Sequence, residues 1–224
     1  MPDRDIVSWA SLLQAFVKKG DLSSAKRLFD LMPRWNVVVF NSMVSGFANL
    51  GDLSSAESMF AWIPEATLRD NVSWNVMLAA YSQAGDLEEA RRLFSTMPER
   101  NTASWNTLIG GEAYYGEHAM DFFRGMCVHG LDASEISFLN CLVACNHKGH
   151  IEQACNLFLS MSFDHNLEHW EEHFSLMVDV LGRTGQLNTA KELVQGMPLE
   201  PNVGAQGALF ESQIRVTCTL KSKA

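Results

Sequence analysis

The chain has 224 residues, of which 47% are hydrophobic, and a formal net charge of −9. This negative balance argues against a protein that holds nucleic acid by charge alone, and no apolar run is long enough to span a bilayer, so no membrane partner is expected. The five cysteines are irregularly spaced, which favours reduced thiols and an intracellular compartment.

The chain opens with Met1-Pro2-Asp3-Arg4-Asp5, which matches Met97-Pro98-Glu99-Arg100-Asn101, the closing residues of an internal repeat. Residues 1–5 are therefore expected to be the end of a truncated repeat. A natural start more often shows a leader or a polar capping helix. We expect the chain to be a fragment, or a shortened gene product, that lacks upstream repeats.

The clearest repeat lies in Val72–Arg100, where two apolar patterns at helical spacing are separated by Gly85. Asp86, with Glu89 three residues later, predicts a capping box at the start of the second helix. That helix places Leu93 among its apolar residues, so Leu93 is expected in the core between repeats.

The turn glycine recurs at intervals of 31 to 36 residues, at Gly20, Gly51, Gly85, Gly116, Gly149 and Gly185. A period of this size indicates an all-α solenoid of helical hairpins, each of which hides its apolar face against its neighbours. The sequence predicts six units, at 6–36, 37–70, 71–101, 102–134, 135–170 and 171–202. Residues 203–224 are expected to form a truncated, degenerate C-terminal extension.

The first helices open with similar triplets, Ser8-Trp9-Ala10, Val39-Phe40-Asn41, Ser73-Trp74-Asn75, Ser104-Trp105-Asn106, Ser137-Phe138-Leu139 and His173-Phe174-Ser175. Units often close with Met-Pro. This pattern resembles the pentatricopeptide repeat proteins of plant organelles, and it is closest to the subclass that mixes standard, long and short repeats. Tetratricopeptide repeats are the competing family, but their Trp-x2-Leu-Gly-x2-Tyr signature does not occur here. The resemblance implies a right-handed superhelical solenoid.

The resemblance also implies binding of single-stranded RNA, with one base read per repeat by the fifth and the last residue of each unit. These pairs are Ala10 with Asn36, Asn41 with Asp70, Asn75 with Asn101, Asn106 with Ser134, Leu139 with Trp170, and Ser175 with Asn202. Asn can donate and accept toward a base edge, Asp accepts, and Ser does either. The alternative is that an Asn near a helix start is merely a cap.

In the family the second residue of each unit helps to sandwich the base, a role that Val38 and Val72 fit. By the family's pairing pattern, Asn41 with Asp70 favours uridine, Asn75 with Asn101 a pyrimidine, and Asn106 with Ser134 cytidine. Leu139 with Trp170 is not expected to read a base, and Ala10 weakens the first unit. Among the cations, only Lys18 and Lys19 are expected near the end of a first helix, so few phosphates can be neutralised and binding should be weak.

The implied role is a recognition module for organellar RNA processing or cytidine-to-uridine editing in a mitochondrion or chloroplast, alongside editing-complex proteins. The chain itself is expected to be no enzyme and to use neither a cofactor nor a small-molecule substrate. The deaminase that follows the repeats in editing relatives has His-x-Glu and Pro-Cys-x-x-Cys zinc motifs. Here His169-x-Glu171 stands without a following Cys-x-x-Cys. The alternatives are a protein-interaction scaffold and a nonfunctional gene remnant.

Two clusters could be read as metal sites, and both have a simpler interpretation. Cys141 and Cys145, near His147 and His150, lie in an apolar stretch and are expected in the core. His165, His169 and His173 are expected at a solvated acidic helix end. The aromatics that open the first helices are likewise expected to be core anchors, because they neighbour the reading position and point elsewhere. No metal is expected.

Overall fold

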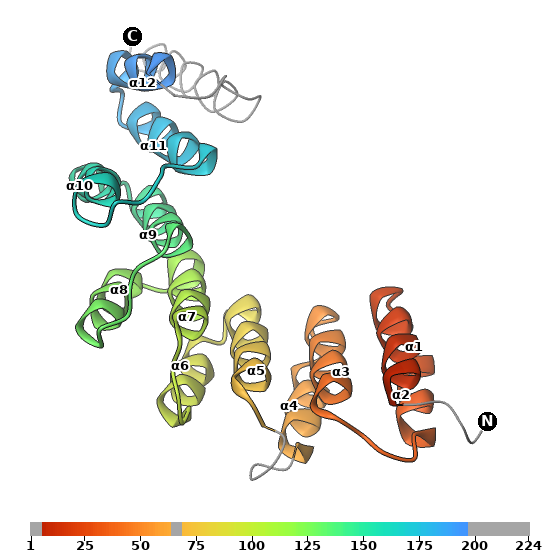
Figure 1. Ribbon diagram of the computed structural model, residues 1–224. Coiled ribbons are helices and arrows are strands. Elements are labelled where there is room, and N and C mark those ends of the chain that lie inside the picture. Colours follow the sequence, from red (N-terminus) through yellow and green to blue (C-terminus); the bar gives the residue numbers. More distant parts are fainter. Residues whose placement is uncertain (1–5, 64–68, 197–224) are drawn as a thin grey trace. The chain divides into compact units, whose positions relative to one another are not determined.

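The computed structural model describes residues 6–63 and 69–196, and the regular elements in those ranges are twelve helices (Figure 1). The helices are α1 (Ile6–Lys18), α2 (Leu22–Leu31), α3 (Val37–Asn49), α4 (Leu53–Trp62), α5 (Asn71–Ala84), α6 (Leu87–Thr96), α7 (Thr102–Tyr115), α8 (Ala119–Val128), α9 (Glu135–Lys148), α10 (Ile151–Phe163), α11 (Glu171–Arg183) and α12 (Leu187–Gln195). The expected extension at 203–224 lies outside the described residues. Within them, no helix is both long and apolar enough to cross a membrane.

The chain divides into two compact units, Met1–Gly111 and Glu112–Ala224, with the division inside α7. In the first unit, α1 with α2, α3 with α4, and α5 with α6 form hairpins. The odd-numbered helices α1, α3 and α5 lie side by side (Figure 1). In the second unit, α9 pairs with α10 and α11 with α12, while α9 packs beside α11. Among the described helices, contacts join hairpin partners, successive first helices, or a second helix and the first helix that follows it.

The turn inside a hairpin follows from local chemistry, as the α5–α6 turn shows. Gly85 ends α5 with φ of 76°, a left-handed conformation that glycine adopts without a steric penalty. Asp86 then caps α6, and its Oδ1 accepts the Glu89 N–H at 3.3 Å. The predicted reciprocal half of the capping box is wrong, because the Glu89 carboxylate accepts from Arg92 at 2.8 Å instead.

Gly116 departs from this turn. The glycines with left-handed φ in the described residues are Gly20, Gly51, Gly85, Gly130, Gly149 and Gly185. Helix α7 continues to Tyr115, and the Gly116 N–H still bonds to the Glu112 carbonyl at 3.0 Å. The buried Glu112 carboxylate then accepts the His118 N–H at 3.2 Å, so an acidic side chain organises the turn that a left-handed glycine makes elsewhere.

The packing of α6 corrects the expected position of Leu93. The buried residues of α6 are Leu87, Ala90 and Phe94, spaced three and four residues apart along one face. Leu93 lies at the edge of that face and is only half-buried. Leu93 therefore lies at the margin of the core and not in its fully buried part, where the sequence pattern predicts it.

The aromatics that open the first helices act mainly as core anchors, as predicted. Phe40, Trp105, Phe138 and Phe174 are at most 8% exposed, whereas Trp9 and Trp74 are half-buried. Each buried ring packs against a phenylalanine of the preceding second helix. These ring pairs tie one hairpin to the next.

Candidate nucleic-acid interface

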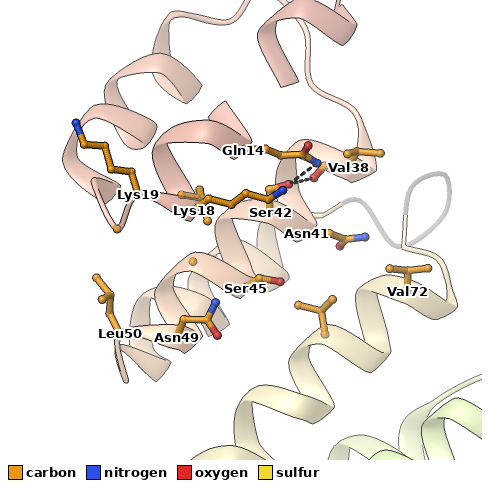
Figure 2. Close-up of a pocket in the computed structure, with 14 residues that line it drawn as sticks. Gln14, Lys18, Lys19, Val38, Asn41, Ser42, Ser45, Asn49, Leu50 and Val72 are labelled. Atoms are coloured by element: carbon orange, nitrogen blue, oxygen red, sulfur yellow. Dashed lines mark hydrogen bonds between the residues drawn. The ribbon is translucent and has the colours of Figure 1, made fainter. Parts of the chain in front are cut away.

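A groove of about 890 Å³ opens along the first helices α1, α3 and α5 of the first unit (Figure 2). It is lined by Gln14, Val17, Lys18, Lys19, Gly20, Val38, Asn41, Ser42, Ser45, Gly46, Asn49, Leu50, Val72 and Val76. Its lining mixes five amide- or hydroxyl-bearing side chains with five aliphatic ones, and its two lysines stand at one end. Such a lining offers hydrogen bonds to an extended polar ligand.

Two exposed valines stand on either side of Asn41 in this groove. Figure 2 shows Asn41 between Val38, in the first turn of its own helix, and Val72, in the first turn of the next first helix. Val38 is 44% exposed and Val72 is 57% exposed, so both present apolar surface to the groove. The structure thus presents a polar amide between two apolar walls, a gap suited to a flat ring with hydrogen-bonding edges.

Asn41 is paired with Asp70, the residue immediately before α5. Asp70 caps α5, because its Oδ1 accepts the Ser73 N–H at 2.8 Å and the Ser73 hydroxyl at 2.9 Å. The Asn41 side chain also hydrogen-bonds to this carboxylate. Partial burial raises the pKa of Asp70, but the hydrogen bonds from Ser73 and Asn41 outweigh it and leave the pKa below its usual value. The carboxylate is therefore ionised and can only accept.

The next pair repeats this geometry with an amide in place of the carboxylate. Asn101 Oδ1 accepts the Ser104 N–H at 3.0 Å and the Ser104 hydroxyl at 3.0 Å. Asn75 Nδ2 donates to the same Oδ1 at 3.5 Å. The Oδ1 atoms of Asn41 and Asn75 are both buried without a hydrogen-bond partner. Each fifth residue thus turns its NH2 group toward the following cap residue.

Capping has a chemical consequence for the cap residue. The Oδ1 atom accepts the hydrogen bonds of the helix start. The second terminal atom stays outside the cap, and it is an oxygen in Asp70 and an NH2 in Asn101. Two pairs with the same geometry therefore differ in one atom, an acceptor in the first and a donor in the second. The alternative that an Asn near a helix start is a cap applies to the last residue of a unit and not to Asn41 or Asn75, which are the fifth residues of α3 and α5 and lie beyond the first turn.

The other predicted pairs show only part of this geometry. Asn36 caps α3 through Oδ1 to the Val39 N–H at 3.0 Å, but Ala10 is buried and has no polar group. Asn106 is half-buried on α7, and Ser134 caps α9. Ser175 is half-buried on α11. Its predicted partner, Asn202, lies outside the described residues.

Cations at the ends of first helices are more frequent than predicted. Helix α9 ends at Lys148 and α11 at Arg183, so Lys18 and Lys19 are not alone. Both of these cations are paired within the chain. Lys148 Nζ donates to the Glu117 carbonyl at 3.1 Å, and Arg183 forms a salt bridge with Asp179 at 3.2 Å. Lys18 and Lys19 therefore remain the cations that line the groove beside Asn41.

The candidate metal clusters have structural roles. Cys141 and Cys145 are at most 1% exposed, which confirms their place in the core, and burial raises the pKa of the Cys145 thiol to about 11. The solvated position expected for His173 is wrong, since its side chain is fully buried. Its Nε2 donates to the Glu135 carbonyl at 2.9 Å, and its Nδ1 accepts the Trp170 N–H at 3.0 Å. Within 6–63 and 69–196, no three His, Cys, Asp or Glu side chains are grouped as metal ligands.

Helical hairpins stacked in series, with polar pairs recurring along their first helices, define a tandem helical-repeat protein of the solenoid class. The sequence model of the PPR repeat matches residues 7–37, 38–61, 72–102 and 172–200, about half of the chain. The chain therefore belongs to the PPR, or pentatricopeptide repeat, family.

Curated relatives come from Arabidopsis thaliana. Pentatricopeptide repeat-containing protein At1g50270 is 40% identical over 116 residues, 51% of this chain and 20% of the relative. Pentatricopeptide repeat-containing protein CRR2, chloroplastic, is 37% identical over 116 residues, 51% of this chain and 18% of the relative. The chain thus spans about a fifth of the length of these relatives.

Solved structures confirm the predicted all-α helical-repeat solenoid. The PPR protein PPR10 from maize matches with a TM-score of 0.70 at 19% identity, over 94% of this chain and 31% of PPR10. PPR10 in complex with an 18-nt psaJ RNA element matches with a TM-score of 0.65 at 16% identity, over 96% of this chain and 32% of that one. The PPR domain of Arabidopsis thaliana protein-only RNase P 1, in complex with tRNA, matches with a TM-score of 0.60 at 17% identity, over 76% of this chain and 94% of that one.

Proposed function

We propose that this chain binds single-stranded RNA and reads one base per repeat through the fifth and last residues of successive units. The observation that carries the proposal is the repetition of one geometry at Asn41 with Asp70 and at Asn75 with Asn101. A fold alone would not require two polar pairs at the same register with their caps oriented alike. Solved PPR proteins in complex with RNA give the proposal a precedent within the fold.

The apolar walls and the polar pair have separate roles in this proposal. Val38 and Val72 hold the flat faces of an unstacked base, and Asn41 with Asp70 meets its edge. Uridine offers an N3–H donor to the Asp70 carboxylate, whereas cytidine offers an N3 acceptor that suits an NH2 group. The first pair therefore selects uridine, and the second selects a pyrimidine, with its Asn101 NH2 suited to the N3 acceptor of cytidine.

The wider role is proposed from the family. We infer a recognition module of the subclass with mixed repeat lengths, acting in organellar RNA processing or cytidine-to-uridine editing, with other proteins supplying the chemistry. Relatives named as mitochondrial or chloroplastic support an organellar setting. The chain itself is proposed to have no catalytic activity.

The test is a titration of the purified chain with short single-stranded RNAs that differ only at the base opposite Asn41 and Asp70. A wrong base at one site should weaken binding by about 1–3 kcal/mol, if base readout in protein–DNA complexes is a fair guide. RNAs altered only at bases that face no reading pair serve as controls and should bind alike. Equal affinity for all the RNAs, or no binding, would favour a protein-interaction scaffold instead.

A further inference from the structure

A second repeating arrangement lies directly beside the reading pairs. Besides Phe123 with Phe138, whose ring centroids lie 5.1 Å apart at an interplanar angle of 67°, four junctions bring a phenylalanine of the second helix edge to face against the aromatic ring that opens the next first helix. The pairs are Phe29 with Phe40, Phe60 with Trp74, Phe94 with Trp105, and Phe158 with Phe174, with ring centroids 4.7 to 5.4 Å apart and interplanar angles of 73° to 76°. The four junctions thus share one aromatic geometry.

The residue just before each cap residue closes over this pair. Arg69 Nη2 donates to the carbonyls of Phe60 and Ile63 at 3.0 and 3.1 Å, while its guanidinium lies 4.3 Å from the centre of the Phe60 ring. Arg100 Nε donates to the Phe94 carbonyl at 2.8 Å, with its guanidinium 5.1 Å from that ring. Each arginine holds the end of the second helix by a hydrogen bond and a ring contact at once.

Two side chains that are not arginine make the same pair of contacts. Trp35 Nε1 donates to the Phe29 carbonyl at 2.9 Å, and its ring stacks on Phe29 at 5.5 Å with an interplanar angle of 18°. His169 Nε2 bonds to the Phe158 carbonyl at 2.7 Å, and its ring centre lies 4.0 Å from that of Phe158. Since a carbonyl only accepts, His169 Nε2 carries the proton. We call Trp35, Arg69, Arg100 and His169 the clamp residues.

The clamp residues share a shape and a position in the chain. All four end in a planar group with an N–H donor and stand one residue before a cap, at Asn36, Asp70, Asn101 and Trp170. The cap residue is therefore held at two points. The clamp residue before it is bonded to the end of the preceding helix, and the cap residue itself is hydrogen-bonded to the start of the following helix. A cap residue held from both sides presents its second terminal atom in a fixed direction.

We propose that Arg69 and Arg100 are positioning residues for base discrimination, each acting on the reading residue that follows it, Asp70 or Asn101. The inference rests on the proposed function. Arg69 itself contacts no base; it fixes where the Asp70 oxygen stands relative to the groove. Loss of a clamp residue should reduce discrimination between bases at its own site and leave discrimination at the neighbouring site unchanged.

A crossed experiment separates positioning from general stability. Arg69→Ala and Arg100→Ala are each titrated against RNAs with a right or wrong base at the first or the second site. In wild type, a wrong base at either site should weaken binding by about 5- to 150-fold. Arg69→Ala should reduce that ratio to near one at the first site only, and Arg100→Ala at the second only. A loss that is equal at both sites, or no change in either ratio, would overturn the positioning role.

Rescue variants come from the chain itself. Arg69→Trp and Arg69→His install the side chains found at the equivalent junctions, and both should restore discrimination at the first site. Arg69→Leu keeps bulk but loses the N–H donor and the planar shape, and it should not. Urea unfolding midpoints identify the folded variants, and discrimination is compared among those. Folded Trp and His variants that fail to discriminate at the first site would also overturn the inference.

The titrations of wild type distinguish a failure of the proposed base reading from a failure of the positioning role. If wild type distinguishes no base at either site, the proposed reading function fails, whatever the clamp variants do. If wild type discriminates and the clamp variants retain its ratios, only the positioning role fails. The clamp residues would then be helix-end supports and nothing more.

Discussion

The backbone of Gly111 passes so close to Ser82 that a Cβ built on Gly111 would lie 2.8 Å from the Ser82 Cβ and 2.9 Å from its Oγ. Real Cβ atoms essentially never approach so closely, and the Ser82 Cβ cannot swing aside. Gly111 therefore allows the close approach of α7 to α5 in the first unit.

Gly111→Ala should destabilise the fold, because overpacking of about 1–3 kcal/mol exceeds the gain in helix propensity of about 1 kcal/mol. Gly46→Ala is the matched control, since its Cβ would meet the movable ends of Leu22 and Val17 at 2.7 and 3.0 Å. Urea unfolding should show the larger loss for Gly111→Ala. A Gly111→Ala variant as stable as wild type would contradict the close packing.

Because only one face of α6 is buried, the same substitution should affect stability differently at Ala90 and at Leu93. Ala90 is fully buried, so Ala90→Asp places a charge among apolar side chains and should cost several kcal/mol. Leu93→Asp leaves the carboxylate at the edge of the core, where water reaches it, and should cost clearly less. Thermal unfolding followed by circular dichroism measures both. The opposite order would show that the assigned buried face of α6 is wrong.

His173 predicts a dependence of stability on pH. Burial lowers the pKa of His173 below its ordinary 6.5, so between these two pKa values the unfolded chain binds more protons than the folded one. The contribution of neutral His173 is fully present above pH 6.5 and is lost as pH falls from there through the folded-state pKa. His173→Ser supplies the residue found at the equivalent positions Ser73, Ser104 and Ser137, and it should flatten the curve. Urea midpoints between pH 7.5 and 5 that fall equally in both proteins would contradict this assignment.

Asp70→Asn should change base preference without changing stability. Asn and Asp cap helices about equally well, and the Oδ1 of the substituted amide could still accept from Ser73. The second atom becomes an NH2, so preference at the first site should move from uridine toward cytidine while the second site is unaffected. Thermal melts and RNA titrations measure the two effects separately. Asp70→Ala is the contrast, because it removes the cap and should cost about 0.5–2 kcal/mol. An unchanged preference in Asp70→Asn would count against base reading by this pair.

Lys18 and Lys19 line the groove and predict the salt dependence of binding. If each contacts one phosphate, replacing both by Gln should make the slope of log K against log salt shallower by about 1.4, at about 0.7 per contact on single strands. Lys26→Gln with Arg27→Gln removes the same charge from the exposed face of α2 and should leave the slope nearly unchanged. Equal slopes for the two double variants would mean that the first pair contacts no phosphate.

The hairpins could be predicted from sequence because their turns depend on residues next to one another. A left-handed glycine followed by Asp, as at Gly85 and Asp86, specifies the turn without help from the rest of the chain. The turn after Tyr115 could not be foreseen, since it depends on the buried Glu112 carboxylate, whose burial is a tertiary effect. Leu93 was misplaced for a related reason: apolar periodicity gives a broad stripe and does not say where the neighbouring helix meets it.

The reading pairs were predicted by family resemblance and not by physical chemistry alone. Proximity of Asn75 to Asn101, 26 residues apart, requires the stacking of one hairpin on the next. The clamp residues could not be predicted from the sequence, because they share no residue type: they are Trp35, Arg69, Arg100 and His169. Their common feature is position, one residue before four of the first-helix caps, together with a planar terminal group that carries an N–H; Ala133, before the Ser134 cap, has no such group.

The neighbour-to-neighbour contacts among the described helices bear on how quickly the chain acquires its structure. The described helices meet only their hairpin partner or a member of a neighbouring hairpin, so their contacts reach no farther along the chain than the next hairpin. Little loop-closure entropy is lost before such contacts form, and chains of low contact order fold in microseconds to milliseconds. Any hairpin pair can start the process and recruit its neighbour, so synthesis need not be complete before folding begins.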